Sequence, residues 1–457
     1  MTIESAIEEL RGLLGDRLST APSVLGLHAE DESYYGATPP DAVAFPETTE
    51  EVSQIARICH QAGCPIVPWG VGTSLEGHAL AFQGGVSVDT SRMDKVLEVH
   101  AEDLDVVVQP GVTREALNAD LRATGLFFPI DPGANASLGG MAATRASGTT
   151  AVRYGTMKEN VMAMEVVLAD GRVIRTGSRA RKSSAGYDLT RLFVGSEGTL
   201  GIITELTLKL HGQPEAISSA ICDFPDIETA VSAVIATIQM GVPMARIEFV
   251  DEAAIRGFNQ HTGTAMPERP HLFLEFHGSE AGVAEQAETM ASIAEEFGGG
   301  SFEWATKAED RNRLWHMRHN ALYAAKSLRP GCRVLTTDVC VPISALAEAV
   351  RETAGEIAAS PIEGPIVGHV GDGNFHAALL VMPDAEDELE VAKELAAAMN
   401  ERALRLGGTV TGEHGIGRGK MKYMTAEHGD GWAVMADIKR ALDPSNILNP
   451  GKVVQVN

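Results

Sequence analysis

The sequence predicts an α+β fold made of two domains. A chain of 457 residues is too long for one compact core. Glycine gathers in three short segments of the first half, at residues 70–77, 133–148 and 195–201. After residue 213, helical patterns alternate with strands that look antiparallel, as in α+β domains. We therefore expect four parts: an N-terminal helical segment (1–36), a first domain (37–213), a second domain (214–420), and a C-terminal segment (421–457) that returns to the first domain.

Local signals place the elements of the first domain. Thr49 is expected to cap the helix that follows the first strand, and Gly63 to end it. Asp170-Gly171 is typical of a hairpin turn. The expected elements are, in order, an amphipathic helix at 1–16, strands at 42–46 and 65–70, short strands between 85 and 113, a helix at 113–125, a hairpin at 161–177, and a strand that ends near 210.

The second domain shows longer helical patterns with strands between them. The expected helices lie at 227–241, 284–299, 343–360 and 388–408, and the expected strands at 245–250, 271–278 and 365–381. A last helix begins near 437 and runs into an Asn/Pro/Gly-rich tail.

Composition excludes several classes of function. The net charge of −25 disfavours binding to nucleic acid or to an anionic membrane. The five cysteines include no C-x-x-C pair that could hold an iron–sulfur cluster or a structural zinc. No apolar run reaches membrane-spanning length, and the N-terminal residues include acidic side chains that a transit peptide avoids. We therefore expect a soluble, cytoplasmic protein.

The glycine-rich segments favour a dinucleotide site. Backbone N–H groups without a nearby Cβ can approach a pyrophosphate and bind it without a basic cluster. A Rossmann nicotinamide site would need a third glycine after Gly70 and Gly72, at the position of Leu75. A P-loop would need Gly-Lys-Ser/Thr, which follows none of these segments.

Six motifs carry a resemblance to known families. PWGVGTSLEG, PGANASLGGMAATRASGTTAVRYG and VGSEGTLGIITE resemble, in order and spacing, the PCMH-type FAD-binding domain of the vanillyl-alcohol oxidase superfamily. WHMRHNALYAAK, GHVGDGNFH and TGEHGIGRGK resemble D-lactate dehydrogenases that pass electrons to cytochrome or another carrier. The resemblance covers the chain beyond about residue 37, and it implies a two-part FAD domain followed by an α+β substrate domain.

The resemblance implies FAD held without a covalent bond. Covalent members carry a histidine in the first glycine-rich loop, where this chain has Thr73, and His78 lies outside that position. The residues expected to contact FAD are Pro68, Gly70, Val71, Gly72, Thr73, Ser74, Gly77, Pro110, Pro132, Gly133, Ala134, Ser137, Gly139, Gly140, Thr144, Ser147, Gly148, Tyr154, Gly155, Glu197, Gly198, Gly201, Ile203 and Asn449.

A divalent metal site is expected in the second half. His369 and His376 flank Gly-Asp-Gly-Asn, and in a hairpin their imidazoles would face each other across adjacent strands. Glu413 would complete a His-His-carboxylate set with open coordination positions. Related 2-hydroxy-acid dehydrogenases carry such a set, and the residues do not decide between zinc, manganese and another metal.

Four further residues are expected to act on the substrate. His414, next to Glu413, is the candidate base for the substrate hydroxyl. Arg318 matches the family position that anchors the substrate carboxylate, and Asn374 is a further candidate contact. Enzymes for D-2-hydroxyglutarate carry polar residues where this chain has Leu322 and Thr336, so a small or apolar R-group is favoured, with Leu322 against the methyl of lactate.

The leading hypothesis is oxidation of D-lactate by hydride transfer to FAD. No internal iron–sulfur or haem carrier is encoded, so electrons leave to an external acceptor: cytochrome c, a quinone or an electron-transfer flavoprotein. A homodimer remains open. The alternatives are a glycolate oxidase flavoprotein subunit, another D-2-hydroxy-acid dehydrogenase such as one for D-2-hydroxyglutarate, a metal-dependent hydrolase, and a flavin-binding partner without activity.

Overall fold

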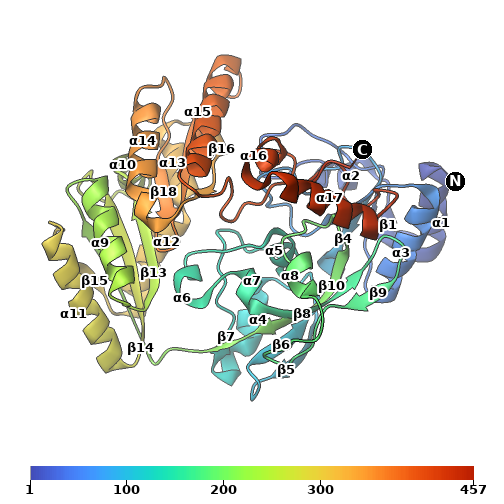
Figure 1. The fold of residues 1–457 in the computed structure, drawn as a ribbon, viewed down its shortest axis with the longest axis horizontal. Coiled ribbons are helices and arrows are strands. Elements are labelled where there is room, and N and C mark those ends of the chain that lie inside the picture. The colour runs from blue at the N-terminus through green and yellow to red at the C-terminus, as the bar shows by residue number, and fades with distance from the viewer. Residues whose placement is uncertain (1, 457) are drawn as a thin grey trace. The chain divides into compact units, whose positions relative to one another are not determined.

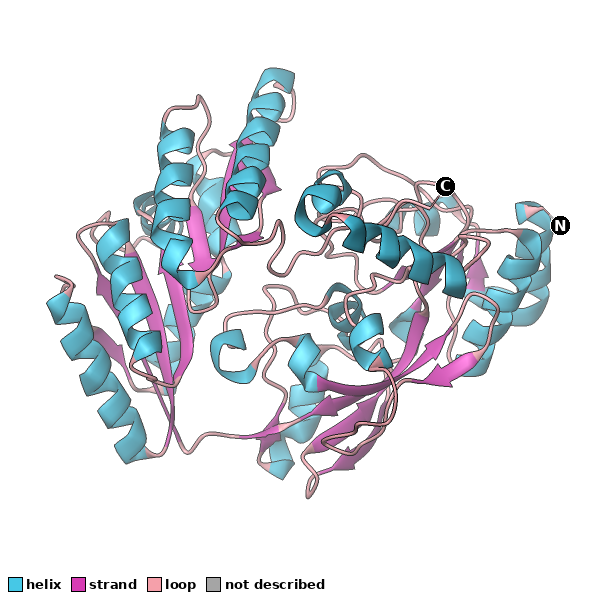
Figure 2. Cartoon of the chain, in the orientation of Figure 1, coloured by secondary structure: helices cyan, strands magenta, loops and turns pink. Residues whose placement is uncertain are grey.

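A computed structural model describes residues 2–456 and divides the chain into two compact units (Figure 1). Unit 1 comprises residues 1–147, 155–213 and 413–457, and unit 2 comprises 148–154 and 214–412. Both units combine helices with mainly antiparallel sheets (Figure 2). The α+β prediction is confirmed.

Unit 1 contains two main sheets and a two-stranded ribbon. The strands of the first sheet are, in spatial order, β1 (Leu18–Ser19), β2 (Ala42–Ala44), β4 (Val86–Asp89) and β3 (Ile66–Trp69). Those of the second are β5 (Val96–His100), β6 (Asp105–Val108), β10 (Ile202–Lys209), β8 (Val161–Val167) and β9 (Val173–Arg175). The ribbon pairs β7 (Leu126–Phe127) with β11 (His211–Gly212). Strand β3 runs directly into the first glycine-rich loop, which fixes where that loop begins.

Short helices and two separate apolar cores complete unit 1. The helices are α1 (Ile3–Leu14), α2 (Pro22–Leu27), α3 (Thr49–Ala62), α4 (Arg114–Asp120), α5 (Leu138–Thr144), α7 (Met157–Asn160), α8 (Leu189–Phe193), α16 (Met424–His428) and α17 (Asp430–Leu442). Thr48 caps α3 instead of the predicted Thr49, because its hydroxyl accepts from the backbone N–H of Glu51. Gly63 ends this helix in the left-handed conformation, as predicted.

Unit 2 is built on one antiparallel sheet. Its spatial order is β15 (Glu303–Ala305), β12 (Ala216–Asp223), β14 (His271–Gly278), β13 (Met244–Val250), β18 (Ile366–His369), β19 (Asn374–Val381) and β16 (Arg333–Thr336), and β17 (Val339–Cys340) also pairs with β19. The predicted hairpin is the β18–β19 pair, with Val367 opposite His376 and His369 opposite Asn374.

Helices cover both faces of this sheet. One face packs a large apolar core against α9 (Ile227–Gln239), α11 (Glu280–Glu296), α14 (Leu346–Ala358) and α15 (Glu386–Arg405). A smaller core on the other face involves α10 (Glu252–Thr262), α12 (Ala308–His319) and α13 (Ala321–Leu328). Because side chains alternate along strands, this second face also carries a group of polar side chains: Ser219, Arg246, Glu248, Glu275, His277 and His369.

Apart from the crossing between residues 213 and 214, the chain passes between the units at points that the sequence does not signal. Residues 148–154, including α6 (Ala151–Tyr154), belong to unit 2 although they continue the second glycine-rich segment. The return to unit 1 comes at Glu413, earlier than the expected boundary at 420. The physical reason is that residues 415–419 pack against loops of unit 1, as described below. None of the helices within residues 2–456 combines the length and apolar character needed to cross a membrane.

Candidate active site

The first two glycine-rich loops of unit 1 are packed against each other. A Cβ on Gly70 would lie 2.6 Å from Ser137 Oγ, and one on Gly139 would lie 2.5 Å from Pro110 Cβ. These positions therefore exclude any side chain. Ser137 precedes α5 but its hydroxyl makes no capping bond, and the buried Oγ has no hydrogen-bond partner among residues 2–456. A buried donor of this kind fits a ligand that supplies an acceptor, such as a phosphate oxygen.

The predicted FAD residues outside 148–154 all lie in unit 1. They occupy the stretches 68–77, 132–147 and 197–203, with Pro110, Gly155 and Asn449 beside them. Gly198 has a positive φ of 72°, and a Cβ there would come 2.8 Å from Pro68 Cγ. The three sequence-distant clusters are thus brought together within one unit, which fits a dinucleotide cradle.

Glu197 joins the third cluster to the C-terminal part of the chain. Its carboxylate accepts hydrogen bonds from the backbone N–H groups of Ile416 and Gly417, both at 2.7 Å. His78 Nε2 lies 3.2 Å from Glu197 Oε2, and both side chains are buried. Glu197 itself has a φ of +53°, a strained value for a residue with a side chain. This carboxylate is therefore an internal anchor between the third glycine-rich cluster and residues 416–417.

His78 and Glu197 shift each other's pKa toward the charged form. Burial alone would lower the pKa of His78, but the Glu197 carboxylate raises it overall. Burial alone would raise the pKa of Glu197, but His78 and the two backbone N–H groups lower it overall. A carboxyl with a lowered folded-state pKa stabilises the fold above its unfolded pKa, and this stabilisation is lost as the pH falls through the folded value.

Asn449 ties the same anchor to the end of the chain. Its Nδ2 donates to the backbone carbonyls of Glu197 at 2.7 Å and His78 at 3.0 Å. The Lys452 ammonium is also buried and donates to the carbonyls of His78 and Leu80 at 2.8 and 2.6 Å. Burial lowers the pKa of Lys452 to about 7. These bonds fix the predicted FAD residue Asn449 against the loops of the cradle.

The residues that follow Glu413 and His414 pack closely against this anchor. Gly415 has a φ of +82°, and a Cβ there would lie 2.6 Å from both Glu197 Oε1 and His78 Nε2. A Cβ on Gly417 would lie 2.1 Å from the carbonyl oxygen of Glu76. Glycine is thus required at 415 and 417, because the backbone there passes too close to neighbouring atoms for a Cβ. This close packing fixes the backbone on the C-terminal side of His414.

Replacing Gly415 by alanine should therefore displace this segment. Overpacking against the two buried side chains of Glu197 and His78 is expected to cost about 1–3 kcal/mol beyond the backbone strain of an alanine at positive φ. Gly125→Ala is the matched control, because Gly125 has a φ of +71° but no atom within 4 Å of the added Cβ. Thermal melting measures the difference, and equal destabilisation of the two variants would contradict the anchor.

In unit 2, Glu248 joins two predicted site residues. Arg318 on α12 donates from Nη2 to Glu248 Oε2 at 2.6 Å, and His369 Nδ1 lies 2.7 Å from Glu248 Oε1. Both Glu248 and Arg318 are buried, with exposed fractions of 1% and 7%. The buried Nε of Arg318 has no hydrogen-bond partner among the described residues. A buried guanidinium with an unused donor is suited to bind a carboxylate.

The two histidines of the hairpin have the same hydrogen-bonding arrangement at Nδ1. Their ring centroids lie 5.5 Å apart. His369 Nδ1 faces the Glu248 carboxylate and His376 Nδ1 faces the Thr337 carbonyl at 3.0 Å, so each neutral ring carries its proton on Nδ1. This tautomer presents Nε2 as a metal-ligating atom. The donor set therefore fits a divalent cation.

Glu413 follows unit 2 directly. Gly412 is the last residue of that unit, and its N–H donates to Asp338 Oδ2 at 2.8 Å. One peptide bond places the Cα of Glu413 about 3.8 Å further along the chain. Of the three expected metal ligands, His369 and His376 therefore lie in unit 2, and Glu413 is the first residue of the segment that returns to unit 1.

Asp338 organises the neighbouring backbone. Asn374 Nδ2 donates to Asp338 Oδ1 at 2.7 Å and to the Val339 carbonyl at 2.8 Å. Thr411 Oγ1 donates to Asp338 Oδ2 at 2.6 Å. Because both Nδ2 hydrogens are used within the protein, a substrate contact of Asn374, predicted from sequence, would have to come through Oδ1.

The remaining predicted residues divide between the two units. Leu322 on α13 is 37% exposed, and Thr336 is half-buried at the end of β16. Tyr154 and Gly148, predicted FAD contacts, lie in unit 2. There Tyr154 Oη lies 2.8 Å from His277 Nδ1, whose other nitrogen lies 2.9 Å from Glu275. Tyr154 therefore belongs to a buried polar chain on the unit 2 sheet.

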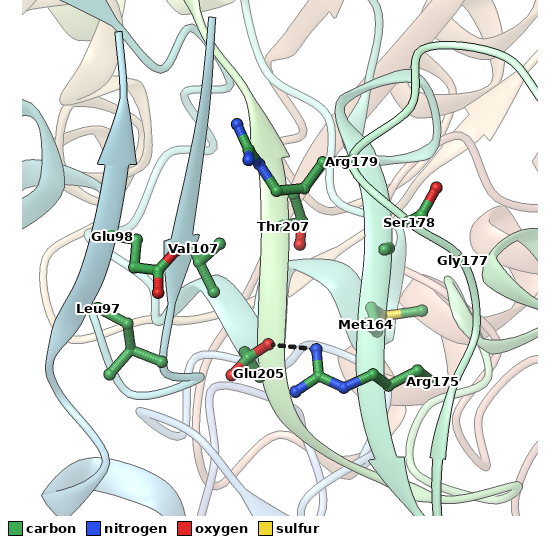
Figure 3. A pocket seen from close by; sticks show the side chains of 11 residues that line it. Leu97, Glu98, Val107, Met164, Arg175, Gly177, Ser178, Arg179, Glu205 and Thr207 are labelled. Atoms are coloured by element: carbon green, nitrogen blue, oxygen red, sulfur yellow. Dashed lines mark hydrogen bonds and ion pairs between the residues drawn. The ribbon is translucent and has the colours of Figure 1, made fainter. Parts of the chain in front are cut away.

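A surface pocket of unit 1 is separate from all these residues. It lies on strands β5, β6, β8 and β10 (Figure 3) and includes none of the predicted site residues. Its two arginines are paired with carboxylates: Arg175 with Glu205 at 3.0 Å and Arg179 with Asp105 at 2.8 Å. The pocket gives no independent indication of an active site.

Sequence reasoning missed two side chains of this arrangement, Glu248 and Asp338. Each lies within or beside a recognisable motif or strand, but neither forms a short motif with its partner. Glu248 is separated from His369 by 121 residues. The available signal was a single glutamate inside the otherwise apolar strand ARIEFV, since a charge at a buried strand position needs a partner.

Comparison with known proteins gives the family. A family model described as "FAD linked oxidases, C-terminal domain" matches residues 213–453, more than half of the chain. A second, described as "FAD binding domain", matches residues 40–177. The chain belongs to the FAD-linked oxidases. It is an FAD-dependent oxidoreductase, as the glycine-rich segments and their resemblance predicted.

Individual relatives of this FAD-linked oxidase cover nearly the whole chain. The probable mitochondrial D-lactate dehydrogenase of Danio rerio is 50% identical, over 99% of this chain and 92% of the relative. The mitochondrial D-lactate dehydrogenase [cytochrome] of Arabidopsis thaliana is 45% identical, over 98% and 80%. The structure of p-cresol methylhydroxylase with bound substrate matches with a TM-score of 0.82 at 18% identity, over 98% and 96%. At that identity the match shows the fold alone, and the predicted PCMH-type fold is confirmed.

The expectation of a cytoplasmic location is contradicted by these relatives. Both D-lactate dehydrogenases bear mitochondrial names. The acidic N-terminal helix on which the expectation rested is a folded element of this oxidase: Ala6, Leu10 and Leu14 of α1 are buried in a core of unit 1. Its composition reflects packing and carries no information about cellular location.

Proposed function

We propose that this FAD-linked oxidase oxidises D-lactate to pyruvate and passes the electrons to an external acceptor. The observation that carries the proposal is the buried Arg318, which uses one nitrogen on Glu248 and keeps a buried donor without a partner. The carboxylate of a substrate would meet that requirement. The names of the two mitochondrial relatives support D-lactate as the first substrate to test.

Each proposed role follows from the chemistry of the side chain. Arg318 binds the substrate carboxylate through its planar fork. His369, His376 and Glu413 hold a divalent cation, zinc or manganese, which when bound makes the substrate hydroxyl more acidic. His414 takes the hydroxyl proton on its imidazole. Asn374 contributes Oδ1, and Leu322 contacts the methyl group.

FAD is proposed to bind without a covalent link, with Pro110, Asn449 and the predicted residues of 68–77, 132–148, 154–155 and 197–203 as its contacts. FAD held by these residues would supply the acceptor for the hydride from C2 of the substrate. Ser137 supports this assignment, because its buried hydroxyl would donate to the cofactor. Thr73 at the position of the attachment histidine supports the non-covalent mode.

The apolar Leu322 favours lactate over a substrate with a second carboxylate. A diacid would need a polar or cationic partner for its distal group, which the side chain of Leu322 cannot supply. The alternatives are glycolate and D-2-hydroxyglutarate. The acceptor is proposed to be a cytochrome c, a quinone or an electron-transfer flavoprotein, and the bracketed term in the name of the Arabidopsis relative favours a cytochrome.

The first test is an anaerobic visible spectrum recorded with D-lactate, L-lactate, glycolate and D-2-hydroxyglutarate in separate samples. Rapid bleaching of the oxidised flavin by D-lactate alone is the expected result. Faster bleaching by glycolate or D-2-hydroxyglutarate would show that this acid, and not D-lactate, is the substrate. A flavin that none of the four acids reduces would overturn the proposal.

A further inference from the structure

We propose that Glu248 is a positioning residue that sets both the proton position of the metal ligand His369 and the direction of the anchor Arg318. The inference rests on the proposed function, because it assigns these two partners their roles. It adds a residue that neither the motifs nor the family resemblance had indicated. Its single carboxylate would couple the binding of metal to the binding of substrate.

The geometry ties three elements of unit 2 to one buried side chain. Glu248 lies on β13, and the pairing of Phe249 with Gly368 places it across from His369 on β18. Oε1 lies 2.7 Å from His369 Nδ1, and Oε2 accepts from Arg318 Nη2 at 2.6 Å. The carboxylate is 1% exposed, so water does not compete for either oxygen.

The acceptor-only character of the carboxylate decides the tautomer of His369. A carboxylate cannot donate, so the neutral imidazole places its proton on Nδ1 and offers Nε2 to a metal. The same negative charge offsets the buried guanidinium of Arg318 and fixes one edge of its fork. One residue therefore meets the electrostatic needs of a cationic side chain and of a metal ligand.

Glutamine at this position would keep the size but not the chemistry. Its amide has one acceptor oxygen and one donor NH2 group. If the NH2 group faces His369, Nδ1 must accept and the proton moves to Nε2, the atom that binds metal. If it faces Arg318 instead, two donors oppose each other. In either orientation the amide also lacks the negative charge, so Glu248→Gln weakens both the support of His369 as a metal ligand and the fixed direction of Arg318.

The test compares metal binding by FAD-loaded protein, stripped of metal and titrated with Zn²⁺ against a chromogenic chelator. Glu248→Gln is expected to weaken Zn²⁺ binding about 10- to 100-fold, as for other residues that orient a metal-binding histidine. Glu248→Asp keeps an acceptor-only group and should bind Zn²⁺ more tightly than Glu248→Gln. An aspartate variant no better than the glutamine variant would overturn the tautomer argument.

The matched control is Glu275→Gln on the neighbouring strand β14. Glu275 is also buried and also contacts an arginine and a histidine, Arg246 at 3.3 Å and His277 at 2.9 Å. This variant should keep the Zn²⁺ affinity of the unaltered chain. Equal losses in the two glutamine variants would show a general effect of disturbing the sheet and would overturn the inference.

A second readout separates this inference from the proposed function. Pyruvate should perturb the flavin spectrum on binding, and its Kd should rise about 10-fold or more in Glu248→Gln because the fork of Arg318 is no longer fixed. If the unaltered chain binds no Zn²⁺, the proposed metal site is wrong. The pyruvate titration then remains as the test of whether Glu248 directs Arg318. An unchanged pyruvate Kd would overturn the inference.

Discussion

Replacing Arg318 by lysine is expected to raise the KM for D-lactate about 10- to 100-fold while FAD content stays unchanged. Lysine keeps the positive charge that Glu248 requires, but it loses the planar fork that can bind a carboxylate through two parallel hydrogen bonds. One charge-assisted hydrogen bond contributes about 1.5–3 kcal/mol, which gives this range of affinity. Steady-state kinetics and the Kd for pyruvate measure the effect.

Arg313→Lys is the control for this substitution. Arg313 lies on the same helix, α12, but its side chain is 85% exposed, and its carboxylate partner Asp310 lies 3.6 Å away on the same helix. The control should leave KM unchanged. If Arg318→Lys also leaves KM unchanged, the carboxylate of the substrate is bound elsewhere, and the buried Arg318–Glu248 pair serves the stability of the sheet.

The local part of this architecture could be read from the sequence because its signals are local. Glycine clusters, the Gly-Asp-Gly-Asn turn and helix stops such as Gly63 act through the backbone of a few consecutive residues. They indicated the α+β class, the hairpin that carries His369 and His376, and the loops that carry the flavin-binding motifs. Even the error at the cap of α3 was one residue, since Thr48 and Thr49 offer the same hydroxyl.

The pairing of distant strands could not be read in the same way. Whether β13 lies beside β18 depends on the order of strands in a sheet, and nothing in either segment encodes that neighbour. Glu248 therefore remained an isolated charge until the fold placed it beside His369. The same holds for Glu197, whose sequence motif indicated the flavin domain but not its bonds to Ile416 and Gly417 more than 200 residues later.

These long-range contacts have the same chemical basis in both units. In both units a buried carboxylate with two or more partners holds a segment that carries a proposed functional residue: Glu197 holds the backbone after His414, and Glu248 holds His369 and Arg318. Buried carboxylates are costly unless every oxygen is satisfied, so such residues have few tolerated substitutions. Burying such a carboxylate lowers the stability of the fold but holds its partners in one geometry. A site for proton and hydride transfer requires this fixed geometry.

Replacing His414 by glutamine is expected to slow reduction of the flavin by D-lactate about 10²- to 10⁴-fold, the usual contribution of a general base. Glutamine has nearly the length of histidine and can hydrogen-bond, but it cannot accept a proton at neutral pH. Because Gly415, Ile416 and Gly417 are held by the anchor on Glu197, the backbone next to the substituted residue should not move. The rate constant is measured by anaerobic stopped-flow absorbance.

His428→Gln provides the comparison for a histidine in the same unit outside the proposed site. The side chain of His428 is 35% exposed at the end of α16. In the His428→Gln variant, D-lactate should therefore reduce the flavin at the same rate as in the unaltered chain. A fall in the rate of His414→Gln with an unchanged Kd for pyruvate assigns the loss to proton transfer. A parallel rise in that Kd would mean that His414 binds the substrate as well. If His414→Gln reduces at the full rate, another group accepts the hydroxyl proton and the proposed mechanism is wrong at that step.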